Sequence, residues 1–492
     1  MVIVQGNSFC KLAEFTDFER KLVEHSLTYS DEAKEKQINH LRRALQKAQF
    51  RRQFRKVAYL AGAIEKLGEF NVCLLNKDNT FPAGILFKVK ELYDKALKDP
   101  RYSGKLNKLV VKDERSKPEP YNLFRWNNKP PEMRYYQKEC LDLAMLHNRG
   151  TFEVCVGGGK TLIAANIIKE TGVNTLFVVP STALSQQTFN VFSSYFGKNN
   201  VQQLTTKDVK TNKKFKPIII STIQTLNSLV KQNLVEKVAN HIHSLMIDEA
   251  HHGASDSYLN LLPYLNEVYY RFNFSGTYTR NDGRIMELWG VCDQKLYKYS
   301  SAQATEDKFL TPVQFKIKKI KGTDEDNYSD EYHKNYSSSS FLSKVVEEVK
   351  TIPTDKQILI LVDRKDLVGQ QIHDFLTIAK IESSYVTGDN NKKELTDAME
   401  DFNDKKIRIL IASTVLGEGA DIRSTDYLIL ARGGKSEIAI TQAIGRAVRL
   451  YPGKDVATVI DFEWEGTRWL GKHSLLRMET YVEEFNGKII RT

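Results

Sequence analysis

The stretch that decides the fold of this chain is Phe152-Glu153-Val154-Cys155-Val156-Gly157-Gly158-Gly159-Lys160-Thr161-Leu162-Ile163-Ala164-Ala165. A short β-type run comes first, three glycines form a turn, and an apolar helical run begins at Lys160. Glycine lets backbone N–H groups approach a phosphate closely, and the N-terminus of a helix favours negative charge. The stretch therefore predicts a strand, loop and helix that hold a nucleoside triphosphate, with Gly157, Gly158 and Gly159 around its phosphates.

Two side chains at the start of this helix have the chemistry that bound ATP requires. Lys160 would neutralise oxygens of the β- and γ-phosphates, and the Thr161 hydroxyl would complete the coordination of Mg²⁺. Val154 stands where the usual phosphate-loop pattern opens with glycine, but the glycines nearest Lys160 remain. ATP and Mg²⁺ are thus the predicted cofactors. The alternative is a strand-to-helix turn with a purely structural role.

Two adjacent carboxylates, Asp248 and Glu249, directly follow the apolar run Ser244–Ile247, 87 residues after Thr161. In open parallel sheets, binding sites lie at the carboxyl ends of the strands. Asp248 fits the role of Mg²⁺ ligand, and Glu249 fits the base that orients or deprotonates the attacking water. A solvated surface pair is the alternative, but the preceding apolar strand argues against it.

Strands and helices alternate in two blocks of the chain, residues 130–312 and 341–465. This alternation predicts an α/β fold with two parallel sheets, each covered by helices. Lys321–Ser340 is polar, acidic and serine-rich, and residues 313–340 are predicted to be a linker. Residues 1–129 lack the alternation and end in proline-bearing connections, which predicts a small N-terminal α/β accessory domain. Residues 466–492 are predicted to be a C-terminal tail.

The composition is that of a folded protein: of 492 residues, 41% are hydrophobic and 27% are charged. The longest apolar runs have the length of a strand, far from the roughly 20 residues of a membrane-spanning helix. No basic segment followed by an apolar one opens the chain, so we expect no secretion signal, no membrane partner and a cytoplasmic location. Five scattered cysteines without a Cys-x-x-Cys pair predict reduced thiols and no zinc site.

A net charge of +11 favours a polyanionic partner, and part of it is concentrated near the N-terminus. The segment Lys34–Leu67 has a helical pattern in which aromatic residues alternate with basic ones. Its basic residues include Arg42, Arg43, Lys47, Arg51, Arg52, Arg55 and Lys56, and its aromatic residues are Phe50, Phe54 and Tyr59. One interpretation is a helix that contacts nucleic-acid phosphates; the other is a solvated helix face.

Further fragments occur in a fixed order along the two alternating blocks. In the first block they are Arg134-Tyr135-Tyr136-Gln137, Pro180-Ser181-Thr182, Ser221-Thr222-Ile223-Gln224 and Ser275-Gly276-Thr277. In the second block they are Ser413-Thr414-Val415-Leu416-Gly417-Glu418-Gly419-Ala420-Asp421 and Gln442-Ala443-Ile444-Gly445-Arg446-Ala447-Val448-Arg449. Together with Asp248-Glu249-Ala250-His251, these fragments resemble the motifs of superfamily 2 helicases of the DEAH-box type. The resemblance covers most of the chain.

This resemblance implies two RecA-like motor domains in tandem and a role for each fragment. Arg134 and Gln137 would bind the adenine side of ATP. Pro180, Thr182, Thr222, Gln224 and Thr414 would contact the nucleic-acid backbone, and Gly419 and Asp421 would help to hold the nucleotide. Ser275 and Thr277 would couple hydrolysis to domain movement, although Gly276 stands where many members have alanine. Gln442, Arg446 and Arg449 match the arginine-finger motif.

The arginine-finger motif also has a physical rationale of its own. An arginine from a second domain meets the γ-phosphate only when the two domains close, so closure is linked to ATP. Arg446 and Arg449 are separated by about one turn of a helix, which predicts that both face the same side. A basic helix face without a role in catalysis is the alternative.

A second resemblance concerns residues outside the motor motifs. Leu75–Leu86, followed by a helix to about Leu97, is similar to the accessory domain of UvsW-type phage helicases, which unwind and branch-migrate recombination intermediates. Gly433-Gly434-Lys435-Ser436 and the basic-aromatic segment Trp469–Tyr481 are also similar to that group. The basic insertion from Lys34 to Lys56 departs from its pattern. The resemblance implies a phage-encoded protein that acts in the host cytoplasm.

The sequence thus predicts an ATP- and Mg²⁺-dependent DNA helicase or translocase, monomeric in isolation, that acts on branched DNA. Its partner would be single-stranded, duplex or branched DNA, held mostly through backbone contacts that are independent of sequence. Three alternatives stay open: a translocase that does not separate strands, an RNA helicase, and a nucleic-acid-binding switch gated by ATP.

Overall fold

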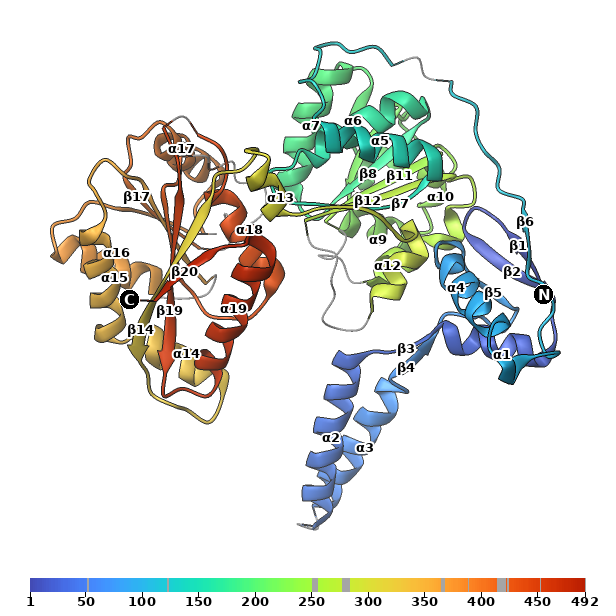
Figure 1. Ribbon diagram of the computed structural model, residues 1–492, viewed down its shortest axis with the longest axis horizontal. Helices are drawn as coiled ribbons and strands as arrows, with labels where there is room; N and C mark the ends of the chain where they lie inside the picture. Colours follow the sequence, from blue (N-terminus) through green and yellow to red (C-terminus); the bar gives the residue numbers. More distant parts are fainter. Residues whose placement is uncertain are drawn as a thin grey trace. The chain divides into compact units, whose positions relative to one another are not determined.

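The computed structural model describes residues 1–50, 53–121, 124–249, 255–276, 284–363, 368–387, 389–413, 422, 424–451 and 453–491. The chain forms two compact units (Figure 1). The first comprises Met1–Phe152 and Thr161–Tyr297, and the second comprises Glu153–Lys160 and Lys298–Thr492. None of the helices in the described ranges combines the length and the hydropathy that crossing a bilayer requires.

The N-terminal residues build a small α/β structure around a four-stranded sheet with strand order β5-β2-β1-β6. Its strands are β1 (Val2–Gln5), β2 (Phe9–Glu14), β5 (Thr80–Pro82) and β6 (Val110–Asp113). Its helices are α1 (Asp17–Ser26) and α4 (Leu86–Leu97), with short 3₁₀ turns at Ala83–Ile85 and Pro100–Tyr102. A capping box between Thr16 and Glu19 starts α1. The predicted helix ending near Leu97 is confirmed.

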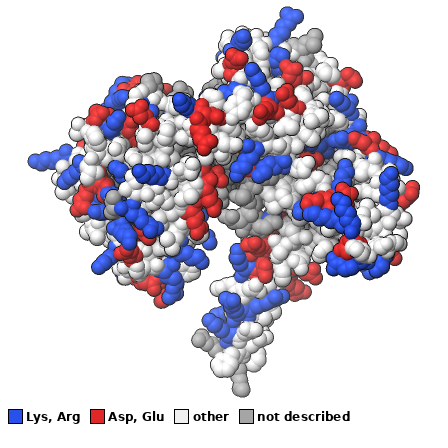
Figure 2. All heavy atoms as spheres, in the orientation of Figure 1, with Lys and Arg blue, Asp and Glu red and all other residues white. Residues whose placement is uncertain are grey.

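A helical hairpin extends from a two-stranded stem (Figure 1). The stem pairs β3 (Thr28–Ser30) with β4 (Asn71–Cys73) in antiparallel fashion, and the hairpin consists of α2 (Glu32–Phe50) and α3 (Phe54–Leu67). The helical structure predicted for Lys34–Leu67 is therefore confirmed, as two helices instead of one. On the visible face of this hairpin, Lys and Arg side chains gather on the part nearer the stem (Figure 2).

A seven-stranded sheet with strand order β13-β7-β12-β11-β8-β10-β9 forms the first motor domain. Its strands are β7 (Arg149–Val154), β8 (Thr175–Val179), β9 (Val201–Gln203), β10 (Ile218–Thr222), β11 (Ser244–Asp248), β12 (Tyr270–Ser275) and β13 (Lys295–Tyr299). The pairs that β8 makes with β10 and β11 are parallel, as are β9 with β10 and β11 with β12. A parallel sheet puts the carboxyl ends of these strands at one edge.

Helices connect the strands of this sheet. They are α6 (Lys160–Thr171), α7 (Thr182–Phe196), α8 (Thr206–Lys210), α9 (Ile223–Lys231), α10 (Glu236–Ala239), α11 (Ser255–Leu259) and α12 (Ile285–Cys292). The helix α5 (Tyr135–His147) precedes β7, and α13 (Ser301–Glu306) follows β13 in the second unit. A 3₁₀ turn at Leu262–Tyr264 precedes β12. Every residue of the central strands β8 and β10 is buried because helices cover them, as in other α/β folds.

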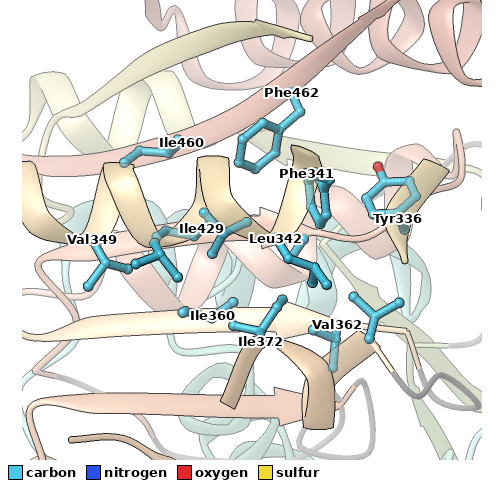
Figure 3. Packing of buried hydrophobic residues seen from close by; sticks show 14 of the residues in the cluster. Tyr336, Phe341, Leu342, Val349, Ile360, Val362, Ile372, Ile429, Ile460 and Phe462 are labelled. Carbon is cyan, nitrogen blue, oxygen red and sulfur yellow. The ribbon is translucent and has the colours of Figure 1, made fainter. Parts of the chain in front are cut away.

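A second seven-stranded sheet, with strand order β16-β17-β15-β18-β19-β14-β20, forms the second motor domain. Its strands are β14 (Val313–Lys321), β15 (Ile358–Val362), β16 (Ser384–Val386), β17 (Ile409–Ser413), β18 (Tyr427–Ala431), β19 (Ala457–Glu465) and β20 (Lys488–Arg491). Its helices are α14 (Tyr328–Tyr336), α15 (Ser339–Thr351), α16 (Val368–Ile378), α17 (Lys392–Asn403), α18 (Glu437–Ala447) and α19 (Trp469–Phe485). In its core, Phe341 and Leu342 of α15 pack with Ile360, Ile429 and Ile460 of three adjacent strands (Figure 3). The prediction of two parallel-sheet motor domains in tandem behind a small N-terminal α/β domain is confirmed.

The prediction that residues 313–340 form a linker is wrong. This segment contains β14, which pairs in parallel with both β19 and β20, and the helix α14. Tyr328, Tyr332 and Tyr336 recur at every fourth position, the spacing of one helix face, and the last two are buried in the core. The serine run begins a helix, because the Ser338 hydroxyl accepts a hydrogen bond from the N–H of Phe341 at the start of α15.

The prediction that residues 466–492 form a C-terminal tail is also wrong. These residues form α19 and β20, and β20 is an edge strand of the second sheet beside β14. Arg477 of α19 is buried and makes a bidentate ion pair with Asp461 of β19, at 2.8 and 3.0 Å. Tyr481 also donates a hydrogen bond to Asp461, at 2.6 Å. A buried charge pair that is fully hydrogen-bonded fixes α19 to the sheet, because removing either partner leaves an uncompensated charge.

Candidate functional site

The glycine loop joins β7 to α6 in the manner that the sequence predicted. Gly157 and Gly159 both have φ near +81°, a left-handed conformation that favours glycine. A Cβ atom on Gly158 would lie 2.5 Å from Cγ1 of Val154, so that position has no space for a side chain. Val154 is the last residue of β7 and has no left-handed φ, which explains why this position does not require glycine.

This loop fits a phosphate group. Lys160 is the first residue of α6, so the N–H groups of the first helical turn lie directly after the glycines. Thr161 follows as the second helical residue, and both side chains are partly exposed. An anion is stabilised at such a helix N-terminus by the backbone N–H groups and by the helix dipole.

The acid pair ends the strand β11, two places along the sheet from β7. Asp248 is the last residue of β11 and Glu249 follows with φ of +51°, a strained value for a non-glycine residue. Neighbouring residues in the described part of the chain hold its side chain: the Ser275 hydroxyl donates to Oε2 at 3.2 Å, and the Gly276 N–H donates to the same oxygen at 3.3 Å. These donors restrain the position of the Glu249 carboxylate.

The contact between Ser275 and Glu249 follows from the strand order. β12, which ends at Ser275, lies between β7 and β11, so the loop that follows it is next to the acid pair. The sequence motif predicted a coupling role for Ser275, but nothing in the sequence indicated which group it touches. A shift of Ser275 would move Glu249 directly.

The fragments predicted to contact nucleic acid follow the next two strands, β8 and β10. Pro180 directly follows β8, and Thr182 is the first residue of α7 and is exposed. Thr222 is the last residue of β10 and caps α9, because its hydroxyl accepts a hydrogen bond from the Thr225 N–H at 3.3 Å. Gln224 is exposed on the first turn of α9. The carboxyl edge of this sheet therefore carries the phosphate loop and acid pair on one part and the predicted backbone contacts on the other.

Arg134 and Gln137, the predicted adenine-side residues, are at the start of α5. The Gln137 side chain is 3% exposed, and its carboxamide oxygen accepts a hydrogen bond from the Arg134 N–H at 2.9 Å. The Arg134 guanidinium donates to the Tyr136 hydroxyl at 3.2 Å. The motif thus has a structural role as a helix cap.

Gln442 and Arg449 are in the second unit, on α18 and just after it. The helix ends at Ala447, and Val448 is its C-cap. Arg449 therefore follows the end of the helix and does not share a helical turn with Arg446. That both arginines face the same side stays a prediction, because the Arg446 side chain is outside the described residues. Gln442 is on the fifth position before that end and is partly exposed.

Two side chains that the sequence did not single out hold the backbone at Arg449. The Lys454 ammonium, 8% exposed, donates to the carbonyl of Ala447 and, at 3.2 Å, to that of Arg449. Thr311 donates through its N–H to the carbonyl of Val448 at 2.8 Å, and through its hydroxyl to that of Arg449 at 3.2 Å. The last carbonyls of a helix need such donors, and a cation is favoured there by the helix dipole. No sequence signal marked Lys454, since Gly453 and Asp455 make it look like an exposed loop residue.

The buried Lys454 predicts a pH dependence of stability. Burial lowers the pKa of Lys454 to about 8, with Asp426 acting weakly in the opposite direction. The unfolded state, with a lysine pKa near 10.4, binds more protons between these values, so the free energy of unfolding rises with pH there. From pH 8 to pH 10 we expect wild type to gain roughly 2 kcal/mol relative to Lys454→Met, measured by urea unfolding. An equal pH dependence in the two proteins would contradict the assignment.

The loop before α18 is fixed by the segments that were mistaken for linker and tail. A Cβ atom on Gly433 would lie 2.5 Å from the hydroxyl oxygen of Tyr328, on α14. The Gly433 N–H donates to Asp363 at 3.1 Å, and Arg477 of α19 donates to the carbonyl of Gly434 at 3.1 Å. These contacts position the start of the helix that carries Gln442.

Several predicted residues are outside the described part of the chain. They are Arg51, Arg52, Thr277, Thr414, Gly419 and Asp421, together with Ala250 and His251 of the acidic motif. The backbone of Arg446 is described as part of α18, but its side chain is not. The roles assigned to these residues stay predictions.

Comparison with known proteins supports the class that this geometry indicates. Residues 130–280 match the family model described as "Type III restriction enzyme, res subunit", and residues 340–451 match "Helicase conserved C-terminal domain". The structure is similar to that of the ATP-dependent Type ISP restriction-modification enzyme LlaBIII bound to DNA, with a TM-score of 0.56 and 14% identity, covering 80% of this chain and 34% of that one. At this identity the likeness shows the fold alone.

Two curated relatives are similar in sequence. The "ATP-dependent DNA helicase uvsW" of Enterobacteria phage T4 is 24% identical over 460 residues, which cover 85% of this chain and 89% of that protein. The "Putative ATP-dependent helicase IRC3" of Saccharomyces cerevisiae is 27% identical over 366 residues, which cover 68% of this chain and 51% of that protein. This chain therefore spans about half the length of the yeast relative.

Two RecA-like domains in tandem, with a phosphate loop and an acid pair on the first, define a nucleic-acid-dependent ATPase of the helicase class. Within that class the chain carries the domains of both family models and resembles superfamily 2 helicases of the UvsW type. Its two motor domains are those of ATP-dependent helicases and translocases.

Proposed function

We propose that this protein is a Mg²⁺-dependent DNA helicase that unwinds and branch-migrates branched DNA, and that it is phage-encoded. The observation that carries the choice of branched DNA is the basic hairpin α2–α3 on the accessory domain. Between Lys36 and Ile64 the sequence has eight Lys and Arg residues and no acidic residue. A motor that only follows one strand does not need a second basic surface on an accessory domain, whereas a junction offers a second arm to bind.

In the proposed site, residues of the first domain hold the nucleotide. Lys160 would neutralise charge on the β- and γ-phosphates, while Thr161 and Asp248 would hold Mg²⁺. Glu249, held by Ser275 and Gly276, orients the attacking water and accepts its proton. Phosphoryl transfer needs chiefly position and charge neutralisation, and these groups provide both. Bound Mg²⁺ would supply further neutralisation of the phosphate oxygens.

Movement along the nucleic acid arises because the motor domains have an open and a closed state, which differ in their affinity for ATP. ATP favours closure of the two motor domains, since Arg449 and Arg446 complete the site from the second domain, and hydrolysis removes that preference. The residues that follow β8 and β10 hold the phosphate backbone in a manner independent of sequence. Ser275 contacts Glu249 of the ATP part, which supports the coupling role that its motif predicts.

The basic hairpin gives the direct test of the branched-DNA proposal. Arg42, Arg43 and Arg55 are exposed, and we expect the triple change to glutamine to weaken fork and four-way junction binding. Each lost phosphate contact should reduce the slope of log affinity against log salt by about 0.9. The measurement is a salt titration of binding, with ATP-dependent unwinding on forks, four-way junctions, linear DNA duplex and RNA duplex.

A matched control removes three exposed lysines elsewhere, Lys98, Lys231 and Lys350, and should leave the salt slope unchanged. If the hairpin variant unwinds forks normally with an unchanged slope, the hairpin is a solvated surface and the branched-DNA proposal loses its structural basis. Preferential unwinding of RNA duplex would instead favour an RNA helicase.

A further inference from the structure

We infer that the far end of the hairpin α2–α3 is a base-stacking site, where Phe50 and Phe54 stack on bases exposed at a DNA junction. The phosphate contacts proposed above use only the charged residues of the hairpin and leave the aromatic ones without a role. This inference deepens the proposed function and rests on it, because junction DNA is the assumed partner.

The aromatic side chains near the hairpin turn are unusually exposed. Phe50, the last residue of α2, is 91% exposed, and Phe54, the first residue of α3, is 79% exposed. Tyr59, further along α3, is 74% exposed. Leaving a phenylalanine in water instead of burying it forgoes about 1.5–3 kcal/mol, so two such residues at one turn indicate a surface that is covered in the functional complex.

The hairpin is not built to hide these rings. Among the described side chains of the two helices, Ile38 and Leu60 are the buried ones, so the helices pack through a thin apolar seam. Phe50 and Phe54 lie beyond that seam at the helix ends that adjoin the turn. Additional burial inside the hairpin is therefore not available to either ring.

The positive charge of the hairpin indicates that a nucleic acid binds to this surface. The whole hairpin, residues 32–67, contains ten basic and three acidic residues, a net charge of +7 within a chain of net charge +11. Exposed aromatic rings on a basic hairpin match the chemistry of unpaired nucleotides, which offer a flat base to the ring and a phosphate to the cation. Bases in an intact duplex are not accessible in this way, whereas a fork or junction exposes them.

The stem fastens the hairpin to the first motor domain. The hydroxyl of Tyr29 on β3 donates to the buried Glu287 of α12, and Arg284 pairs with the same carboxylate at 2.9 Å and with Asp31 at 3.9 Å. Gly84 approaches α12 so closely that a Cβ atom there would lie 2.1 Å from the Trp289 carbonyl oxygen. Because the stem is fixed to a helix of the motor domain, a base stacked at the far end is displaced when that domain moves along the strand.

The test compares substitutions that separate stacking from general apolarity. The first variant is Phe50→Ala with Phe54→Ala, the second changes both residues to leucine, and the third changes both to tryptophan. The probe is a DNA fork with 2-aminopurine at the first unpaired position of each arm, and its fluorescence is measured without ATP. Both side chains are largely exposed, so all three variants are expected to fold, which circular dichroism checks.

We expect the alanine and leucine variants to lose the fluorescence change at the junction and to bind the fork about tenfold more weakly, whereas tryptophan retains both. The salt slope should stay that of wild type, since no charge is removed, and ATP hydrolysis stimulated by single-stranded DNA should change by less than about twofold. Unwinding of the fork should fall with binding.

Other outcomes overturn the inference. Full fork binding by the alanine variant would show that the rings do not touch DNA, and full activity of the leucine variant would show apolar docking without stacking. Binding of wild type, but not of the alanine variant, to vesicles of anionic lipid would assign the surface to a membrane.

If wild type fails to unwind any branched DNA but still changes the junction fluorescence, the proposed function fails while the stacking site stands.

Discussion

Lys160→Ala is expected to reduce ATP hydrolysis stimulated by nucleic acid by a factor on the order of a thousand or more. In the proposed site Lys160 supplies positive charge to the β- and γ-phosphates, and no other cation among the loop residues 154–161 can replace it. DNA affinity should stay within about twofold of wild type, because the predicted backbone contacts follow β8 and β10. Steady-state hydrolysis and fork binding measure the two quantities.

Lys169→Ala is the matched control for this experiment. Lys169 is on the last turn of the same helix, α6, and pairs with Glu170 at 3.1 Å on the surface. Its loss should leave hydrolysis unchanged, since a surface ion pair contributes little. Wild-type hydrolysis by Lys160→Ala would disprove the site assigned to the glycine loop, and with it the account of ATP binding.

Arg449→Ala is expected to lower the single-turnover rate of ATP hydrolysis by about 10³–10⁵ while nucleotide binding is retained. An arginine finger acts on charge that develops in the transition state, whereas ground-state binding depends on the first domain. Arg449→Lys should not restore the rate, because an ammonium cannot reproduce the two-pronged geometry of a guanidinium. Arg446→Ala is expected to behave similarly.

The control is Arg468→Ala, which removes an arginine of the same unit that is 65% exposed and pairs with Asp324 at 3.8 Å. This variant should hydrolyse ATP at the wild-type rate. If Arg449→Ala also does so, the residue only packs beside Thr311 and Lys454, and the finger must be sought elsewhere on the second domain.

Local features of the fold could be predicted because they depend on residues close in sequence. The helix α7 (Thr182–Phe196) begins at a local cap, because Ser181 accepts a hydrogen bond from the Leu184 N–H within the same segment. The helix that begins at Lys160 is of the same kind, because three preceding glycines and an apolar run specify it.

The errors came from segments whose structure depends on distant partners. Residues 321–340 look like a linker by composition, yet Tyr336 is buried against Phe341 and Trp464, and the latter is more than a hundred residues away. Arg477 and Asp461 likewise look like solvent-exposed charges until the sheet brings them together. Composition favours a surface position for polar residues, and only the tertiary contact reverses that preference.

The sequence alone determined that this chain has a phosphate loop, an acid pair after a buried strand and two α/β blocks, because each of these is a short-range pattern of residue types. Only the tertiary structure decided that β12 separates β7 from β11, and therefore that Ser275 holds Glu249. It also decided that Lys454 closes the end of α18 beside Arg449. Strand order and burial arise from packing between distant segments, and no local pattern in the sequence encodes them.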